Sequence, residues 1–394
     1  SRRQRQMCIR DRKRYCIFSA QFLPHMGGVE RYTYYLAKEL VGRGNAVTVV
    51  ANNTTKGPDY ECIEGIEVYR FPCYELINGR FPVPKMMNRT YQKINRVLNQ
   101  KIFDMVIINT RFYIHSLHAA KFAKQKGIYS ICIEHGTSHL SVHNAILDKV
   151  GAIYEHFHTA ILKRYCKNFY GVSQACTEWS EHFNIQPKGV LYNSIDLDEL
   201  NDIYQNVVPE YKKRYEIPDD GIVISFTGRL LKEKGIPSLL SATEKIQKKY
   251  NNIYLFIAGD GDLKEEIEKR KSKHIIPLGK ISYQEVVRLL KETDIFCLPS
   301  FSEGMSTSVL EAAACKCYII TTERGGAKEL LNGEEYGTII PNNQEDVLYN
   351  AICEAVENPE HRKKAVEKTY QKLEESFNWK TVASQVEKLC NDNS

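Results

Sequence analysis

Residues 298–317 read L-P-S-F-S-E-G-M-S-T-S-V-L-E-A-A-A-C-K-C, and the rest of the chain is best interpreted outward from this stretch. Its pattern predicts the end of a buried strand, a tight loop of small polar residues, and a helix that begins near Thr307. The first N–H groups of such a helix, around Met305 and Ser306, lack intrahelical partners and carry positive partial charge. We therefore expect a phosphate group to bind there.

Two glutamates flank this expected phosphate site. Glu303 lies in the loop, and Glu311 follows eight residues later, about two helical turns away. Because carboxylates accept hydrogen bonds from hydroxyl groups, each glutamate can hold a polyhydroxyl group on one side of the phosphate. A ligand with hydroxyl groups on both sides of a phosphate is a nucleotide sugar.

Length and composition indicate a two-domain globular protein. A chain of 394 residues exceeds the size at which one hydrophobic core usually splits. The hydrophobic fraction is 43% and the charged fraction 26%, both ordinary for soluble proteins. No apolar run approaches the ~20 residues of a membrane span, and no signal-peptide pattern is present. We therefore expect a cytoplasmic protein.

The net charge of +6 comes from one end of the chain. Residues 1–14 hold seven basic residues and one acid, so residues 15–394 carry 47 charges of each sign. Nothing in the remainder favours a nucleic-acid partner. We interpret 1–14 as a non-native or disordered leader; a basic arm that binds a partner is the alternative.

Cysteines and histidines do not form a metal motif along the chain. The twelve cysteines lack zinc-site spacing, since Cys315 and Cys317 are too close for C-x-x-C. We expect them to be reduced and to pack as small apolar residues. His143, His156 and His158 are expected on the acceptor side or at the surface, because no carboxylate lies at ligand spacing. No metal is therefore predicted.

Each half of the chain alternates strands with helices, which predicts an α/β protein with two doubly wound, Rossmann-like domains facing each other across a cleft. We place the first domain at 15–195 and the second at 196–378, and expect the helix 379–394 to pack back on the first. The predicted strands of the first domain are 15–21, 46–51, 66–71, 104–109, 129–134, 169–173 and 190–195. Those of the second are 222–227, 253–258, 275–278, 294–298, 318–321 and 337–340.

The segment 80–101 contains six basic residues and no acid. Its basic residues Lys85, Arg89, Lys93 and Arg96 fall on one side of a helix, and Met87, Tyr91, Ile94 and Leu98 fall on another. Such a helix can lie on an anionic bilayer, so peripheral contact with the inner face of the cell membrane through 85–98 is one prediction. The alternative is a helix with one face on the core and a solvated basic face.

Ligands of open parallel sheets bind beyond the carboxyl ends of the strands, so the loops after strands are the places to search. Gly27 and Gly28 precede a helix and let the backbone approach an anion, although a glycine turn there is common. Arg229 and Lys234 follow another strand, with Gly228, and two cations suit a diphosphate leaving group. The alternative is a pair of solvated surface charges.

Three further features remain ambiguous. Ala258-Gly259-Asp260-Gly261-Asp262 resembles half of a dinucleotide fingerprint but lacks its third glycine. The D-x-D pairs 196/198 and 260/262 mimic metal ligands, but we interpret both as structural, the second as a helix cap. His135 ends a buried strand, where it can donate a hydrogen bond to a substrate hydroxyl.

Together these segments resemble the retaining glycosyltransferases of the GT-B fold, the group 1 family (family 4). The resemblance covers nearly all of 15–394, and its most specific element is the family's E-x7-E motif, which Glu303 and Glu311 match. The other motifs follow in the family's order: G-G-V-E-R, E-H-G, N-S-I-D, G-R-L-L-K-E-K-G, A-G-D-G and L-P-S-F-S-E-G. One departure is Met305-Ser306-Thr307 after E-G, where many members have Phe, Gly or Pro, so the donor's identity stays open.

The resemblance implies catalytic roles for four residues. Arg229 and Lys234 would neutralise the charge that develops on the departing nucleoside diphosphate. Glu303 and His135 would contact the donor sugar. The implied donor-binding residues are Gly27, Gly28, Gly228, Gly259, Leu278, Gly279, Gly304, Met305, Ser306, Thr307 and Glu311, the last of these holding the ribose.

The implied reaction is transfer of a sugar, expected from a UDP-sugar, to a glycan or lipid-linked acceptor in polysaccharide or glycolipid synthesis. The anomeric configuration would be retained, with cations in place of a metal, no cofactor, and domain closure that excludes water. Glu303 is not expected to be a nucleophile, because double displacement needs two carboxylates about 5 Å apart across the bond.

Alternatives from other classes stay open. A nucleotide-sugar epimerase on the same scaffold would turn over the donor without an acceptor. A non-catalytic sugar-nucleotide-binding protein would tolerate the loss of Lys234 or Glu303. A phosphorylase would need a pyridoxal lysine and a longer chain. A dinucleotide oxidoreductase is disfavoured, because no full glycine fingerprint follows the first strand.

Overall fold

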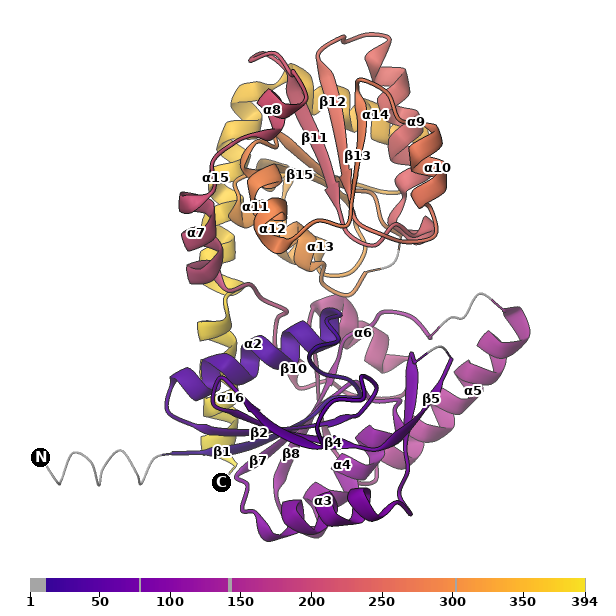
Figure 1. Ribbon diagram of the computed structural model, residues 1–394, viewed down its shortest axis with the longest axis vertical. Coiled ribbons are helices and arrows are strands. Elements are labelled where there is room, and N and C mark those ends of the chain that lie inside the picture. Colours follow the sequence, from indigo (N-terminus) through magenta and orange to yellow (C-terminus); the bar gives the residue numbers. More distant parts are fainter. Residues whose placement is uncertain (1–11, 78, 141–143, 302, 394) are drawn as a thin grey trace, which may run out of the picture. The chain divides into compact units, whose positions relative to one another are not determined.

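The computed structural model describes residues 12–77, 79–140, 144–301 and 303–393 (Figure 1). Most of the predicted leader, together with His143 and Ser302, lies outside the described residues. The chain forms two compact units: the second comprises Asn193–Asn378, and the first comprises the residues before it together with the segment from Trp379. Each unit is an α/β layer structure with its own sheet.

The sheet of the first unit has eight strands in the order β10-β9-β8-β7-β1-β2-β4-β3. The strands are β1 (Arg14–Phe18), β2 (Ala46–Asn52), β3 (Tyr60–Ile63), β4 (Ile66–Phe71), β7 (Met105–Asn109), β8 (Tyr129–Glu134), β9 (Asn168–Gly171) and β10 (Gly189–Val190). All neighbours pair in parallel except β3 with β4. A separate hairpin is formed by β5 (Cys73–Leu76) and β6 (Phe81–Pro84).

The edge strand β3 and the β5–β6 hairpin were not among the predicted strands. The turn between β3 and β4 consists of Glu64 and Gly65, with φ of 49° and 84°. Two successive residues at positive φ are typical of the two-residue turns that connect antiparallel strands. Strand β3 is largely exposed, so it lacks the continuous apolar run by which the buried parallel strands were found.

Helices cover both faces of this sheet. They are α2 (Gly28–Gly42), α3 (Arg89–Gln100), α4 (Ile114–Gln125), α5 (Ala145–Leu162), α6 (Gln174–Glu181) and α16 (Trp379–Asp392). In Figure 1, α3 and α4 lie below the sheet and α2 lies above it. Helix α16 packs against α2, and the Trp379 ring lies 5.0 Å from the Tyr32 ring.

Helix α3 has one face on the core and a solvated basic face, which is the alternative to a membrane-bound helix that the sequence left open. Its apolar residues Tyr91, Ile94 and Leu98 are at most 5% exposed and belong to the core beneath the sheet. The basic residues Arg89 and Lys93 on its other side are exposed. The apolar side of this helix is therefore occupied by the protein's own core.

The second unit has a six-stranded parallel sheet in the order β13-β12-β11-β14-β15-β16. The strands are β11 (Ile222–Thr227), β12 (Ile253–Ala258), β13 (Ile275–Gly279), β14 (Ile295–Leu298), β15 (Tyr318–Thr322) and β16 (Thr338–Ile340). The helices are α7 (Leu197–Asn206), α8 (Tyr211–Arg214), α9 (Ile236–Gln247), α10 (Lys264–Lys269), α11 (Tyr283–Lys291), α12 (Thr307–Ala314), α13 (Ala327–Leu330), α14 (Glu345–Glu357) and α15 (Pro359–Ser376), with 3-10 turns η1 (Lys232–Lys234) and η2 (Glu334–Tyr336).

This order is that of a doubly wound Rossmann sheet, in which the chain turns back at the first strand. Here the reversal lies between β11 and β14, which are paired neighbours. The loops that leave these two strands therefore begin side by side, at the place where open α/β sheets bind ligands.

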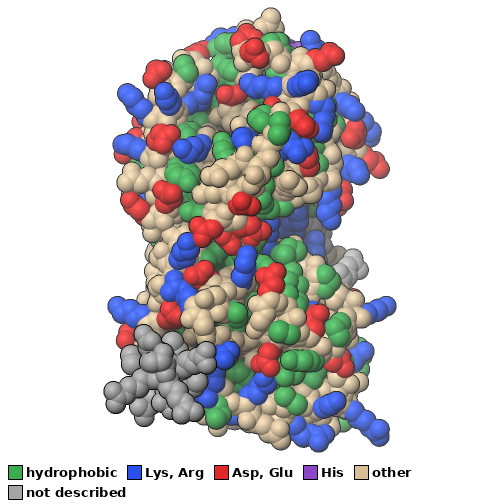
Figure 2. All heavy atoms as spheres, turned by 60° about the vertical axis from the view of Figure 1, so that its left-hand side comes forward, with side chains coloured by type: hydrophobic (Ala, Val, Ile, Leu, Met, Phe, Trp, Pro, Cys, Tyr) green, Lys and Arg blue, Asp and Glu red, His purple; other side chains and the backbone are tan. Residues whose placement is uncertain are grey.

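Charged side chains are spread over both units. Figure 2 shows Lys and Arg side chains interspersed with Asp and Glu side chains on the visible face of each unit. Among the described residues, no helix is long and apolar enough to cross a membrane.

Candidate active site

The loops after β11 and β14 bring together two residues that the sequence placed 69 positions apart. Lys234 Nζ lies 2.5 Å from Glu303 Oε1, and each side chain is 14% exposed. A charge-assisted contact between two largely buried side chains holds both in one orientation. Glu303 therefore fixes the Lys234 ammonium beside the loop that leads into α12.

Gly235 explains why the two loops can approach so closely. Its φ is 73°, and a Cβ at this position would lie 2.1 Å from the carbonyl oxygen of Pro299. Ser300 Oγ and Phe301 N both donate to the Glu233 carbonyl, each at 3.0 Å. The turn that carries Lys234 is thus held against the loop after β14 by two hydrogen bonds to one carbonyl.

Helix α12 begins at Thr307 as predicted, with Ser306 as its N-cap residue. The Ser306 side chain makes no capping bond; its Oγ lies 3.0 Å from Ser308 Oγ instead. Asn193 Nδ2 donates to the Met305 carbonyl at 3.0 Å and so fixes the backbone that enters the helix. Asn193 was not recognised as a site residue, although it belongs to the quoted N-S-I-D motif.

Glu311 and Arg229 differ in environment. Glu311 lies on α12 and is only 5% exposed. Arg229 is exposed, and its side chain forms no ion pair with any residue that the structure describes. A solvated guanidinium remains available to an incoming anion, whereas Lys234 is already paired.

The glycines of the second unit form backbone contacts between neighbouring loops. A Cβ at Gly259 would lie 1.8 Å from the Gly228 carbonyl oxygen, and Gly259 N donates to Gly279 O at 2.8 Å. Close packing thus accounts for Gly259 without a ligand. Leu278 and Gly279 end β13 beside this contact.

A glycine pair that the sequence pattern did not reveal supports the E-G turn. Gly325 has φ of 61°, and a Cβ there would lie 2.3 Å from the Gly304 carbonyl oxygen. Gly326 N donates to the same oxygen at 2.6 Å. The R-G-G sequence after β15 was the available signal, because left-handed φ in a loop that follows a strand favours glycine.

In the first unit, Gly27 is the N-cap residue of α2, and Gly28 is its first residue. Glu30 Oε2 accepts from Gly27 N at 2.9 Å, so one of the N–H groups expected to face a phosphate is already bound. A Cβ at Gly28 would meet nothing within 4 Å. The open space at this helix start lies beside Gly28 rather than Gly27.

A chain of hydrogen bonds determines which ring nitrogen of His135 carries the proton. Thr33 Oγ1 donates to Val29 O at 2.8 Å, so it accepts from Asn109 Nδ2, also at 2.8 Å. Asn109 Oδ1 therefore faces His135 Nε2 at 3.0 Å and must accept a hydrogen bond from its N–H group.

This network changes the role expected of His135 toward a substrate hydroxyl from hydrogen-bond donor to hydrogen-bond acceptor. Burial lowers the pKa of His135 to about 3, so the ring is neutral near pH 7. With the proton on Nε2, Nδ1 is an acceptor. His135 can accept a bond from a hydroxyl, whereas the sequence pattern predicted that it donates one.

The structure bears differently on the interpretations of the two D-x-D pairs. Asp196 is the N-cap of α7 and accepts from Glu199 N at 3.1 Å, which confirms its structural interpretation. The cap of α10 is Leu263, so the prediction that Asp260 or Asp262 caps this helix is wrong. Asp260 Oδ1 accepts instead from Gly261 N at 3.1 Å.

Two family models match consecutive parts of this chain. Residues 26–199 match Glycosyltransferase Family 4, and residues 207–372 match Glycosyl transferases group 1. The chain belongs to the group 1 glycosyltransferases.

Relatives of this glycosyltransferase occur in archaea, bacteria and eukaryotes. An uncharacterized glycosyltransferase of Methanocaldococcus jannaschii is 26% identical over 95% of this chain and 97% of its own length. A putative teichuronic acid biosynthesis glycosyltransferase of Bacillus subtilis is 27% identical over 77% and 74%. The phosphatidylinositol N-acetylglucosaminyltransferase GPI3 subunit of Saccharomyces cerevisiae is 25% identical over 79% and 68%.

Solved glycosyltransferases share the whole fold. A Rickettsia africae glycosyltransferase aligns with a TM-score of 0.73 and 18% identity, covering 97% of this chain and 98% of its own. Anabaena Alr3699/HepE, solved with UDP, aligns with a TM-score of 0.72 and 16% identity, covering 97% and 100%. The predicted GT-B fold is confirmed.

Proposed function

We propose that this glycosyltransferase moves a sugar from a UDP-sugar to a lipid-linked or glycan acceptor in polysaccharide or glycolipid synthesis. The observation that carries the donor proposal is the Lys234–Glu303 pair, held at 2.5 Å next to the start of α12. The Lys234 ammonium suits a phosphate, and the Glu303 carboxylate suits sugar hydroxyls. The complex of Anabaena Alr3699/HepE with UDP supports the choice of base.

The binding roles that we propose are those that the family resemblance implies. The N–H groups at the start of α12 would bind the diphosphate, with Arg229 and Lys234 supplying positive charge. Glu311 would hold the ribose, and Leu278 and Gly279 would run along the base. Gly28 and His135 of the first unit remain proposed donor contacts, His135 as an acceptor for a sugar hydroxyl.

Two cations and a helix start are a sufficient set of charges for a leaving diphosphate, so we propose that this chemistry uses no metal. We also propose that the anomeric configuration is retained by same-face attack, with the donor phosphate taking the acceptor's proton. The Glu303 carboxylate is engaged by the Lys234 ammonium, which suits a binding role better than a nucleophilic one.

A lipid-linked acceptor is supported by an apolar stripe on α5. Ile146, Leu147, Val150, Ile153 and Phe157 are 56–75% exposed, and four of them recur at helical spacing. An exposed apolar stripe of this kind marks an interaction surface, and a lipid surface is the occupant we propose. The name of the yeast relative, a phosphatidylinositol N-acetylglucosaminyltransferase, accords with a lipid acceptor.

The donor proposal is tested by isothermal titration of the metal-stripped full-length protein with UDP-, GDP- and ADP-sugars. We expect binding of UDP-sugars without added metal, and product whose anomeric configuration by NMR equals that of the donor. If no nucleotide sugar binds, the proposal fails. If a donor is converted to a new sugar without any acceptor, the epimerase alternative is correct.

The membrane proposal is tested by co-sedimentation with vesicles of phosphatidylcholine and phosphatidylglycerol. We expect weaker binding when Ile153 and Phe157 are changed to Ser. Weaker binding is also expected when Lys85, Arg89, Lys93 and Arg96 are changed to Gln. The last three are exposed, and Lys85 is half-buried just before α3. Changing Lys363 and Lys364 of the second unit to Gln is the matched control. Equal binding by all variants would refute a lipid-facing surface in the first unit.

A further inference from the structure

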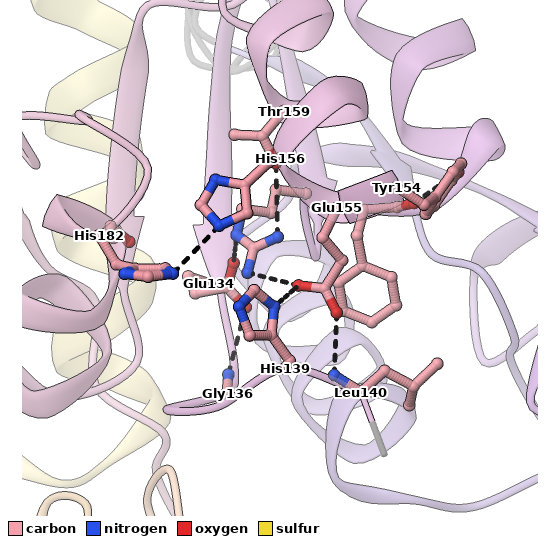
Figure 3. Close-up of polar contacts among 12 residues, drawn as sticks. Glu134, Gly136, His139, Leu140, Tyr154, Glu155, His156, Thr159 and His182 are labelled. Atoms are coloured by element: carbon pink, nitrogen blue, oxygen red, sulfur yellow. Dashed lines mark hydrogen bonds and ion pairs between the residues drawn. The ribbon is translucent and has the colours of Figure 1, made fainter. Parts of the chain in front are cut away.

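Three histidines from separate segments of the first unit converge at its surface. His139 lies in the loop after β8, His156 lies on α5, and His182 is the C-cap residue of α6. One imidazole nitrogen of each lies within 4.8 Å of the corresponding nitrogens of the other two. Figure 3 shows His156 and His182 joined by a dashed line, with His139 beside them.

The spacing of two of these nitrogens is near that of a tetrahedral zinc site. His156 Nε2 and His182 Nε2 are 3.1 Å apart. Two imidazole nitrogens on one tetrahedral zinc ion, each about 2.0–2.1 Å from the metal, are separated by roughly 3.3 Å. A small movement of His139 would bring the third nitrogen to the same distance.

His139 carries the second interaction that metal-binding histidines usually have. Its Nδ1 lies 3.1 Å from Glu155 Oε2, which leaves Nε2 as the metal-facing nitrogen. Glu155 is 2% exposed and is itself held by Leu140 N, which donates to its other oxygen at 2.9 Å. A buried carboxylate thus orients the imidazole, as shown in Figure 3.

The charges behind the histidines favour an additional cation. Arg111, 1% exposed, pairs with Glu134 at 2.8 Å and with Glu155 at 2.9 Å, so two carboxylates face one guanidinium. Burial raises the pKa of Glu134, and the neighbouring Glu155 carboxylate raises it further by a smaller amount. A divalent cation bound to His139 would offset the excess charge through Glu155.

Aromatic rings restrict the two exposed imidazoles. The Trp179 ring is stacked on His182, with centroids 4.8 Å apart and an interplanar angle of 13°. The Phe183 ring lies 4.7 Å from His156. Side chains held in this way lose less conformational entropy on binding a metal than freely rotating ones.

We propose that His139, His156 and His182 form a zinc-binding site, with the fourth position open to water or an anionic oxygen. Three neutral imidazole nitrogens suit Zn²⁺ better than Mg²⁺ or Ca²⁺, which prefer oxygen ligands. The metal would tie the loop that carries His135 and His139 to α5 and α6. All three histidines belong to the first unit, whereas the loops proposed to bind the diphosphate belong to the second, and the role we propose for the metal is to stabilise the first unit.

The proposal is tested by titrating the metal-stripped full-length protein with Zn²⁺ by calorimetry, and with Co²⁺ by visible absorption. We expect one Zn²⁺ per chain, a tetrahedral Co²⁺ spectrum, and a higher Tm with Zn²⁺. Binding should weaken at least tenfold in His156→Ala and His182→Ala, and about tenfold or more in Glu155→Gln.

His361→Ala, an exposed histidine of α15, is the matched control and should bind Zn²⁺ like the parent protein. Because His156 and His182 are exposed, their variants are expected to fold, which circular dichroism verifies. Absence of Zn²⁺ binding by the parent protein, or equal binding by His156→Ala, would overturn the proposal. Neither outcome depends on a nucleotide sugar, so the donor proposal is judged separately.

Discussion

Lys234 lies in a short 3-10 turn with a second lysine, Lys232. The contribution of each lysine to catalysis can therefore be measured separately. Lys234 is paired with Glu303 and 14% exposed, whereas Lys232 is exposed. A cation that is positioned before the reaction stabilises the charge of a leaving diphosphate without reorganising. The two lysines therefore differ in position rather than in charge.

Changing Lys234 to Ala is expected to lower kcat by about 10²–10³, the usual effect of removing one preorganised charge-stabilising group. The same change at Lys232 should alter kcat less than about threefold. Steady-state kinetics with the preferred UDP-sugar measure both. Equal losses at the two positions would show that only the overall charge of the turn matters.

His135 is a second residue whose role depends on its partner rather than on its type. Asn109 Oδ1 accepts a hydrogen bond from His135 Nε2, and Thr33 fixes the orientation of Asn109. Asn109 is thus a positioning residue for the imidazole.

Because burial lowers the pKa of His135 to about 3, its charge should not change between pH 5 and 8. We expect His135→Gln to lower kcat without changing the shape of the pH profile in this range. Asn109→Asp should introduce a new ionisation, since a carboxylate beside the ring raises its pKa. A parent profile with a pKa near 6.5 that His135→Gln abolishes would contradict the neutral ring.

Turns that join the strands to the helices are held by close backbone contacts at glycines. Gly235 and Gly279 both have left-handed φ, at 73° and 66°. A Cβ at Gly235 would lie 2.1 Å from Pro299 O, whereas a Cβ at Gly279 would meet nothing within 4 Å. Alanine variants at these two glycines therefore separate the effect of backbone strain on the free energy of unfolding from the effect of a steric clash.

Gly279→Ala should destabilise the protein by about 1–2 kcal/mol, the cost of a left-handed alanine. Gly235→Ala should cost distinctly more, because the loop after β14 must also move. Urea denaturation monitored by fluorescence provides the two free energies of unfolding. If the two variants are equally stable, the contact between the loops after β11 and β14 is not tight in solution.

At the scale of the whole molecule, the first unit buries several neutral histidines. Burial lowers the pKa of His115 to about 3, and of His118 and His158 to about 4. The unfolded chain binds protons at these groups below about pH 6.5, whereas the folded unit does not. Their contribution to stability is therefore complete above pH 6.5 and is lost as the pH falls toward 4 and 3.

We expect the Tm to fall steeply between pH 6.5 and 4, with each of these histidines contributing up to about 1.4 kcal/mol per pH unit. His118→Phe should flatten this dependence, because the ring packs against Phe18 and Phe71 and a phenyl group can take its place. His361→Phe on the exposed side of α15 should not. Thermal melts at pH 7, 5.5 and 4.5 measure the slopes, and parallel slopes for parent and His118→Phe would contradict the assignment.

Much of the fold follows from local pattern. The strands of the second unit were predicted within one residue, because strands covered on both faces are continuous apolar runs. The start of α12 at Thr307 was predicted from small polar residues before an apolar helix. The exposed strand β3 and the β5–β6 hairpin lack such runs and were missed.

Residues close together in the chain suffice to identify the family, the two strand–helix alternations and the loops in which site residues lie. Which of these residues meet depends on how the chain folds in three dimensions. The pairing of Lys234 with Glu303, the proton on His135 and the meeting of His139 with His156 and His182 each join segments far apart in sequence. Strand order brings those segments together. The residues of 298–317 reach their partners in the loop after β11 because β11 and β14 lie side by side.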